Sequence, residues 1–145
     1  MSTINTILIA EDDADDRFLL KAAFKQNDAN DNLVFVENGV ELFNYLRNCL
    51  KSENIVLPRF VLLDLNMPKK DGREVIKEIK SISVLRNIPV VVFSTANSYL
   101  EMQRCYDLGA NSYITKPNSF EQLVRTVAAL RFYWLHTNLL PFQDT

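Results

Sequence analysis

The sequence lacks the features that mark several classes of protein. No apolar run approaches the ~20 residues of a membrane-spanning helix. Residues 1–5 have no basic region followed by an apolar stretch, as a secretory signal would. The 16 basic and 18 acidic residues give a net charge of −2, without the positive excess that nucleic-acid binding requires. We therefore expect a cytoplasmic protein that binds neither membranes nor nucleic acids.

Cysteine and histidine are also scarce. The two cysteines, Cys49 and Cys105, lie too far apart for a metal-binding motif, so we expect two reduced, partly buried thiols. The one histidine, His136, lacks the helical bundle that a phosphodonor histidine needs, and we expect it at a helix end. The 145 residues suit a single domain, and the hydrophobic fraction of 48% is typical of a folded chain.

Acidic residues are concentrated near the N-terminus. Five of them stand among the six residues from 11 to 16, namely Glu11, Asp12, Asp13, Asp15 and Asp16. Without these five negative charges the net charge would be +3 instead of −2. Asp15 and Asp16 suit the start of a helix, as a cap or as charges that favour the positive end of its dipole. Asp13 is either a residue of the metal site or a charge at its rim or at the helix start.

Short apolar runs alternate with amphipathic segments five times along the chain. The apolar runs predict buried strands, and apolar residues at helical spacing predict the helices between them. The expected strands are 6–10, 33–36, 60–63, 89–93 and 112–115, and the expected helices are 15–26, 40–50, 71–82, 100–108 and 120–133. Gly109 suits a left-handed helix end and Ser119 a helix start. This order predicts an α/β fold with a doubly wound, five-stranded parallel sheet and helices on both faces.

Polar residues follow four of the five expected strands. Glu11 and Asp12 follow the first, Asp64 the third, Ser94 the fourth and Lys116 the fifth. Each alone has an ordinary explanation as a helix cap, a turn residue or a solvated loop charge. Together they would meet at the carboxyl edge of the sheet, where open α/β sheets bind ligands. Three carboxylates need a cation between them, and oxygen ligands favour Mg²⁺. The set also suits phosphoryl transfer to an aspartate.

These residues resemble the response-regulator receiver domain of two-component signalling, a bacterial family. The resemblance covers residues 5–131 and rests on ordered segments, with separations of 52, 30 and 22 residues from Asp12 through Asp64 and Ser94 to Lys116. The segments are 7–13, 63–68 with 71–72, 89–94, 109–110 and 113–117. The resemblance implies the flavodoxin-like strand order 2-1-3-4-5. In its long connection 48–58 and its aromatic C-terminal segment, the chain is similar to the single-domain regulators that partner cyanobacterial phytochrome kinases.

The resemblance implies a role for each residue of the site. Asp64 would accept the phosphoryl group, and Lys116 would pair with Asp64 and then with that group. Asp12 would bind Mg²⁺ directly and Glu11 through water. The main-chain carbonyl of Asn66 would be a further metal ligand, beside Asp64 itself.

A second group of residues would respond to phosphorylation. Ser94 would turn to bond a phosphoryl oxygen, and Tyr113 would change rotamer with it. The peptide bond before Pro117 would be cis, as the family has it. The family usually has a threonine in place of Ser94 and a residue smaller than Thr95, so transfer rates would differ. Ala96 cannot position a water molecule, so we expect slow to moderate self-hydrolysis.

We divide the chain into a receiver domain, 1–131, and an aromatic C-terminal extension of the last helix, 132–145, with no effector domain. The extension either folds back onto its own domain or forms an interface with a second copy, a kinase or a downstream protein. Because nothing follows Thr145, the signal would leave through contact with another protein or by passing on the phosphoryl group.

The resemblance implies a stand-alone response regulator that a sensor histidine kinase phosphorylates on Asp64, and a kinase of the phytochrome type is one candidate. It would be a signalling protein and not an enzyme. The alternative is a binding-only pseudo-receiver that serves as an adaptor, and the complete residue set argues against it. An aspartyl-phosphate phosphatase would need an acid where Asn66 stands. A flavodoxin-type binder would need a Ser-, Thr- or Gly-rich phosphate loop where the acids stand.

Overall fold

Five parallel strands form one sheet in the computed structural model, which describes residues 4–142. The strands are β1 (Thr6–Ala10), β2 (Asn32–Val36), β3 (Phe60–Leu63), β4 (Val90–Ser94) and β5 (Ser112–Thr115). They lie in the order β2-β1-β3-β4-β5, and every neighbouring pair is parallel. The predicted fold and strand order are therefore confirmed. This order puts β1 and β3 side by side in the middle of the sheet.

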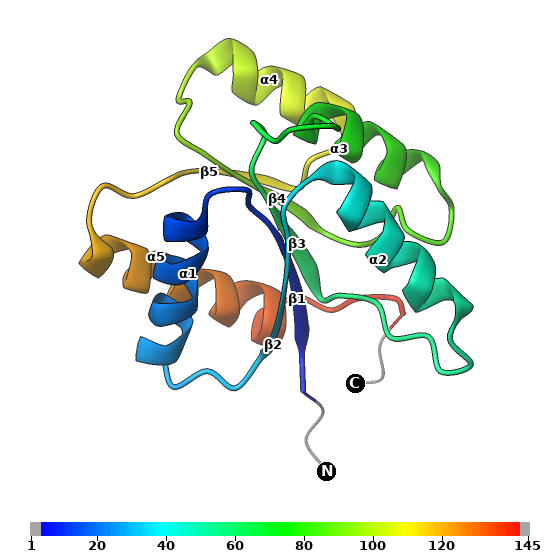
Figure 1. Ribbon diagram of the computed structural model, residues 1–145, viewed down its shortest axis with the longest axis horizontal. Helices are drawn as coiled ribbons and strands as arrows, with labels where there is room; N and C mark the ends of the chain where they lie inside the picture. Colours follow the sequence, from blue (N-terminus) through cyan, green and yellow to red (C-terminus); the bar gives the residue numbers. More distant parts are fainter. Residues whose placement is uncertain (1–3, 143–145) are drawn as a thin grey trace.

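Helices cover both faces of the sheet, as Figure 1 shows. α1 (Ala14–Gln26) and α5 (Phe120–Arg131) lie on one face. α2 (Gly39–Lys51), α3 (Gly72–Ser81) and α4 (Tyr99–Leu108) lie on the other. Because neighbouring residues of a strand point to opposite faces, Ile7 belongs to the core under α1 and α5, and Leu8 to the core under α2, α3 and α4. Both faces are thus packed, which explains the uninterrupted apolar runs of the strands.

The helix ends follow local rules that the sequence indicates. Gly109 ends α4 with a φ of 112°, in the left-handed region that glycine adopts without strain. The Ser119 side chain accepts a hydrogen bond from the backbone N–H of Gln122 and so begins α5. Asp13 caps α1 by accepting from the backbone N–H of Asp16. Of the two interpretations of Asp13, the helix start is the one that the structure bears out.

The chain after α5 differs from the expected helix end. We expected the helix to run to Tyr133, but it changes at Phe132 into a π-helix, η1 (Phe132–Thr137). Within it the backbone N–H of Asn138 donates to the carbonyl of Tyr133 at 2.7 Å, a five-residue step. His136 is exposed at the end of this segment, as expected. Both cysteines are free thiols, Cys105 buried and Cys49 partly buried, also as expected.

The C-terminal segment folds back under the sheet, at the amino ends of the strands. Leu135 is 6% exposed and joins the core under α1 and α5, where the Trp134 ring lies 6.4 Å from that of Phe60. Phe142 packs against the other core, so the segment crosses from one layer to the other (Figure 1). Arg59 stabilises the crossing, because its Nη2 donates to the carbonyls of Trp134, Leu135 and Asn138 at 3.1, 3.2 and 3.4 Å.

Some apolar residues of this segment nevertheless face outward. Phe132 is 70% exposed and Leu139 is 74% exposed. The two sequence-based interpretations of the extension therefore apply to different residues. The buried ones hold the segment to its own domain, and the exposed ones remain free for a partner.

Replacing Leu135 with alanine should lower the free energy of unfolding by about 2–4 kcal/mol, because a buried leucine is truncated to leave a cavity. Chemical denaturation followed by circular dichroism measures this change. Leu139→Ala is the matched control in the same segment and should change stability by less than about 0.5 kcal/mol. Equal effects of the two substitutions would contradict the packing described for the segment.

Candidate functional site

Two acidic side chains are brought together by the pairing of β1 with its neighbours. The backbone N–H of Glu11, one residue beyond β1, donates to the carbonyl of Val36, the last residue of β2, at 2.9 Å. The backbone N–H of Asp64 donates to the carbonyl of Ala10 at 3.0 Å, just after β3. The hydrogen-bond ladder of the sheet thus fixes Glu11 and Asp64 at its carboxyl edge.

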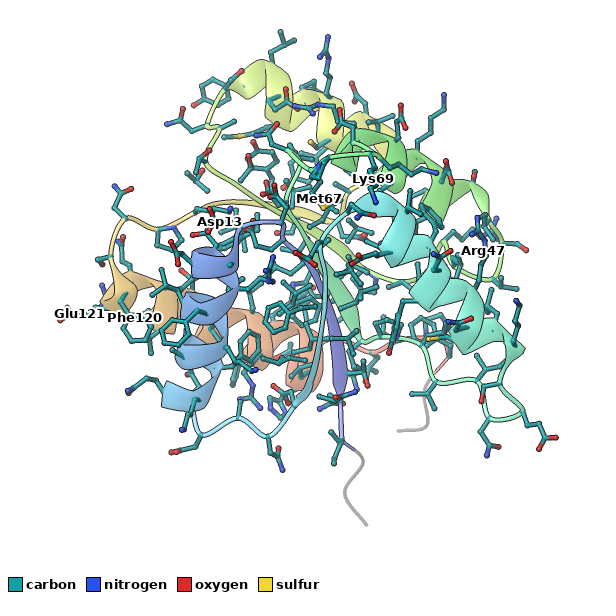
Figure 2. The ribbon with its side chains drawn as sticks, in the orientation of Figure 1. Asp13, Arg47, Met67, Lys69, Phe120 and Glu121 are labelled. Carbon is teal, nitrogen blue, oxygen red and sulfur yellow. The ribbon has the colours of Figure 1, made fainter. Side chains whose placement is uncertain are left out.

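Glu11, Asp12 and Asp64 form one carboxylate cluster. One carboxylate oxygen of each lies within 4.8 Å of the others. Glu11 is 2% exposed and Asp64 8% exposed, whereas Asp12 faces solvent. Ligands of this kind are hard oxygen donors, which suit a divalent cation such as Mg²⁺ or Mn²⁺. Asp13 is not a member of the cluster, and Figure 2 shows it at the start of α1.

Lys116 supplies the positive charge nearest to this cluster. Its Nζ lies 2.7 Å from Oε1 of Glu11, 3.1 Å from Oδ2 of Asp16 and 3.6 Å from Oδ2 of Asp64. The predicted pairing with Asp64 is present as an ion pair, but the hydrogen bonds go to Glu11 and Asp16. The backbone N–H of Lys116 donates to the carbonyl of Ser94 at 2.8 Å, which holds the residue beside β4.

The expected cis peptide bond before Pro117 is wrong for this structure. All peptide bonds within residues 4–142 are trans. The trans form of an X–Pro bond is favoured by about 0.5–1 kcal/mol in the absence of other constraints. Lys116 reaches the carboxylates with a trans bond, so its contacts with Glu11 and Asp16 do not require the cis form.

The pKa values of Glu11 and Lys116 are both raised, for different reasons. Burial raises the pKa of Glu11 to about 7, and the negative charge of Asp64 adds to this shift against the hydrogen bond from Lys116. Burial alone would lower the pKa of Lys116, but the hydrogen bond to Glu11 and the charge of Asp64 outweigh it and raise that pKa. Lys116 is therefore charged at neutral pH, and Glu11 readily takes up a proton.

The loop after β3 is folded tightly around Asp64. The backbone N–H of Asn66 donates to Oδ1 of Asp64 at 3.2 Å, whereas Oδ2 faces Lys116. Gly72, at the start of α3, packs directly under this loop. A Cβ atom at Gly72 would lie 2.7 Å from Cα of Leu65 and 2.9 Å from the carbonyl oxygen of Asp64, so only glycine fits there. The metal-binding role of the Asn66 carbonyl stays a prediction.

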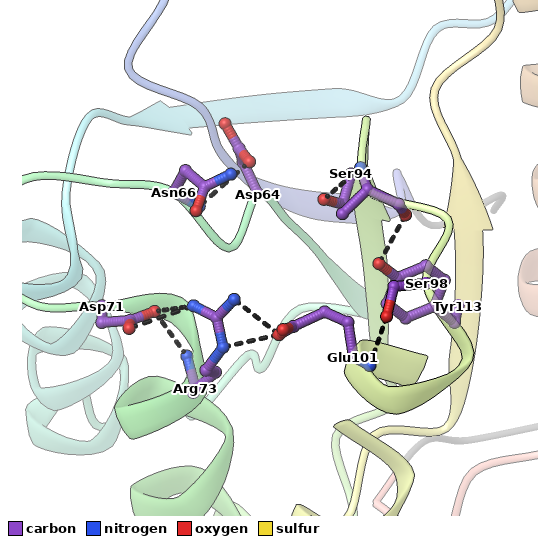
Figure 3. Close-up of polar contacts among 9 residues, drawn as sticks. Asp64, Asn66, Asp71, Arg73, Ser94, Ser98, Glu101 and Tyr113 are labelled. Carbon is purple, nitrogen blue, oxygen red and sulfur yellow. Dashed lines mark hydrogen bonds and ion pairs between the residues drawn. The ribbon is translucent and has the colours of Figure 1, made fainter. Parts of the chain in front are cut away.

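The two predicted switch residues, Ser94 and Tyr113, both contact the backbone of Ala96 in the loop after β4. Ser94 is fully buried, and its hydroxyl oxygen accepts a hydrogen bond from the N–H of Ala96 at 3.2 Å. The hydroxyl of Tyr113 donates to the carbonyl of Ala96 at 2.7 Å. Figure 3 shows both side chains beside this loop, with Asp64 and Asn66 nearby. A movement of Ala96 would therefore change the hydrogen bonds of Ser94 and Tyr113 together.

Sequence reasoning missed a polar network between α3 and α4. Nε of Arg73 donates to Oε1 of Glu101 at 2.6 Å, and Nη1 of Arg73 donates to Oδ1 of Asp71 at 2.9 Å (Figure 3). Cys105 is the only buried residue of α4, so this ion pair is a main attachment of the helix. The pattern Asp71-Gly72-Arg73 indicates a helix start, but nothing in the sequence pairs it with a residue 28 positions further on.

Comparison with known proteins identifies the class. The family described as response regulator receiver domain matches residues 7–128, and the chain belongs to this family. Members accept a phosphoryl group on an aspartate, bind Mg²⁺ or Mn²⁺ at an acidic cluster and partner with sensor histidine kinases. No helix within residues 4–142 is long and apolar enough to cross a membrane.

Particular relatives are single-domain regulators of similar length. Response regulator Rcp1 of Synechocystis sp. is 36% identical over 135 residues, which make up 93% of this chain and 92% of Rcp1. The crystal structure of the phosphorylated cyanobacterial phytochrome response regulator RcpA is 40% identical, with a TM-score of 0.85 over 96% of this chain and 99% of RcpA. The Mn²⁺-bound form of Rcp1 has a TM-score of 0.81, with 36% identity over 94% of this chain and 99% of that one.

Binding of a divalent cation should weaken as the pH falls below about 7, because Glu11 takes up a proton that the cation must displace. One displaced proton corresponds to a loss of about tenfold in affinity per pH unit on the acid side of the pKa. Calorimetric titration with Mn²⁺ between about pH 6 and pH 8 measures the slope. Glu11→Gln should bind more weakly and with a flatter pH dependence, and an unchanged slope in that variant would contradict the assignment.

Proposed function

We propose that this chain is a stand-alone response regulator that accepts a phosphoryl group on Asp64 from a sensor histidine kinase. The observation that carries the proposal is the position of Asp64 beside Glu11, Asp12 and Lys116, with one oxygen held by the N–H of Asn66 and the other facing the ammonium. Phosphoryl transfer depends mainly on such positioning and on neutralising charge. Membership of the receiver family and the similarity to Rcp1 and RcpA support it.

In the proposed reaction a carboxylate oxygen of Asp64 bonds to phosphorus as the bond to the donor breaks, and the donor leaves with that electron pair. Mg²⁺ held by Glu11, Asp12, Asp64 and the Asn66 carbonyl would supply positive charge to the phosphoryl oxygens. Lys116 offers its ammonium to another of these oxygens, since it already lies 3.6 Å from Asp64.

Ser94 is suited to bind a third phosphoryl oxygen. Its hydroxyl oxygen accepts from Ala96, so its proton is free to donate toward Asp64 once the side chain turns. Turning releases the Ala96 N–H, and Tyr113 is bonded to the carbonyl of the same residue. We propose that this shared contact couples phosphorylation to the loop after β4 and to α4. The missing polar side chain at Ala96 supports slow to moderate hydrolysis of the phosphorylated form.

The proposal extends to partners and location. Histidine kinases use ATP, which would place this chain in the cytoplasm beside its kinase. The resemblance to RcpA, a phytochrome response regulator, supports a kinase of the phytochrome type. We propose that the receiver domain, 1–131, carries the switch and that the signal leaves through a protein contact or by further phosphoryl transfer. In this role the chain is a signalling protein and not a turnover enzyme.

Incubation with acetyl phosphate and Mg²⁺ should add about 80 Da, the mass of one phosphoryl group in place of a hydrogen. The adduct should be stable in acid and labile in base, and intact-protein mass spectrometry measures it. Asp64→Asn should abolish the gain, whereas the helix cap variant Asp13→Asn should keep it. A folded wild-type chain that gains no mass would favour the binding-only adaptor instead.

We also propose that the exposed part of the C-terminal segment forms a homodimer interface. Phe132 and Leu139 are the candidates, because they are apolar and exposed while their neighbours hold the segment in place. Exposed aromatic and aliphatic residues of this kind anchor interfaces between proteins.

The double variant Phe132→Ser, Leu139→Ser should be monomeric under conditions where the wild type self-associates, without loss of fold. Sedimentation velocity measures the state of association, and circular dichroism the fold. Ile55→Ser, which alters an exposed apolar residue in the loop after α2, is the control and should behave as the wild type does. A wild type that stays monomeric with and without phosphorylation would refute the homodimer.

A further inference from the structure

Among residues 4–142, Asp16 is the one acid that pairs with Lys116 without belonging to the carboxylate cluster. Its Oδ2 lies 3.1 Å from Nζ, closer than Oδ2 of Asp64 at 3.6 Å. Its side chain is half-exposed on the first turn of α1. The sequence indicates no more than a helix-start role for Asp16.

The first turn of α1 is held firmly enough to present Asp16 at a fixed place. Oδ1 of Asp13 accepts from the backbone N–H of Asp16 at 3.0 Å. On the next residue, Nη1 of Arg17 donates to the carbonyl of Glu11 at 2.9 Å, and Nη2 pairs with Glu37 at 3.4 Å. The helix start is thereby tied to the end of β1. The contact between Asp16 and Lys116 follows from this attachment.

We propose that Asp16 is a positioning residue that competes with Asp64 for the ammonium of Lys116 and so slows phosphorylation of Asp64. The inference rests on the proposed function. Lys116 has one positive charge and divides it among three acids, and its two shortest contacts are with acids other than the phosphoacceptor. To neutralise a phosphoryl oxygen on Asp64, the ammonium must leave at least one of these partners.

The two competing contacts differ in how easily they are given up. Glu11 belongs to the carboxylate cluster, so its hold on Lys116 weakens when a cation occupies the cluster. Asp16 lies outside the cluster, and its attraction for the ammonium persists when a cation is bound there. Asp16 is therefore the acid that retains Lys116 on the α1 side during the reaction.

Asp15 provides a matched control for the effect of Asp16 on Lys116. Asp15 precedes Asp16 in the same helical turn and carries the same charge. Its side chain is exposed, and it has no hydrogen bond or ion pair within the part of the chain that the structure describes. A general effect of surface charge would appear in both Asp15→Asn and Asp16→Asn, whereas a positional effect on Lys116 would appear only in the second.

The test measures the rate of Asp64 phosphorylation in the wild type, Asp16→Asn, Asp15→Asn and Asp16→Glu. Asp16→Asn should be about two- to fivefold faster than Asp15→Asn, the size expected for a half-exposed ion pair. The ratio should be the same for acetyl phosphate and for phosphoramidate, a donor with less negative charge. Asp16→Glu keeps the carboxylate and should return toward the wild-type rate.

A crystal structure of metal-free Asp16→Asn provides a readout that does not depend on phosphorylation. Nζ of Lys116 should move to hydrogen-bond distance of Asp64, about 3 Å. An unphosphorylated wild type would refute the proposed function, but this structure would still decide the positioning role. Equal rates in Asp16→Asn and Asp15→Asn, a slower Asp16→Asn, or an unmoved Lys116 would each overturn the inference.

Discussion

Lys116 supplies the positive charge that allows three carboxylates to share the carboxyl edge of the sheet. The strand ladder brings Glu11 and Asp64 together whether or not their charges favour it, because their backbone N–H groups are bonded to Val36 and Ala10. Repulsion between buried carboxylates must then be offset by protonation, by a cation or by a neighbouring ammonium. Both the raised pKa of Glu11 and the tight contacts of Lys116 are consequences of this constraint.

The same constraint makes the site responsive. A site whose charges were fully balanced would have little tendency to bind a cation or a phosphoryl group. Here the resting arrangement leaves three acids with one ammonium, and each further positive charge relieves repulsion. The buried hydroxyl of Ser94 is bonded to the backbone N–H of Ala96, and the hydroxyl of Tyr113 to the carbonyl of the same residue. The loop after β4, which Ser94 and Tyr113 hold at Ala96, therefore lies close to Asp64, where the charge would change.

The elements with strong periodicity could be predicted from the sequence. The central strands β1, β3 and β4 are buried on both faces and appear in the sequence as apolar runs. The rule that ligands bind at strand ends predicted that Glu11, Asp12, Asp64, Ser94 and Lys116 lie at one edge. Features that depend on contacts across the fold could not be predicted. The pairing of Lys116 with Asp16 spans 100 residues, and that of Arg73 with Glu101 spans 28. The π-helix and the trans bond before Pro117 likewise depend on tertiary context and not on local pattern.

The C-terminal segment crosses beneath the sheet at the end opposite to the acidic edge. Trp134 and Leu135 pack near Phe60, where β3 begins, and Asp64 follows the last residue of the same strand. Four strand residues at about 3.3 Å each put more than 10 Å of sheet between the two ends. A protein bound to the exposed Phe132 and Leu139 would leave the acidic edge open to a kinase. The proposed assembly and the proposed phosphoryl transfer would therefore use opposite ends of the sheet and would not compete for surface.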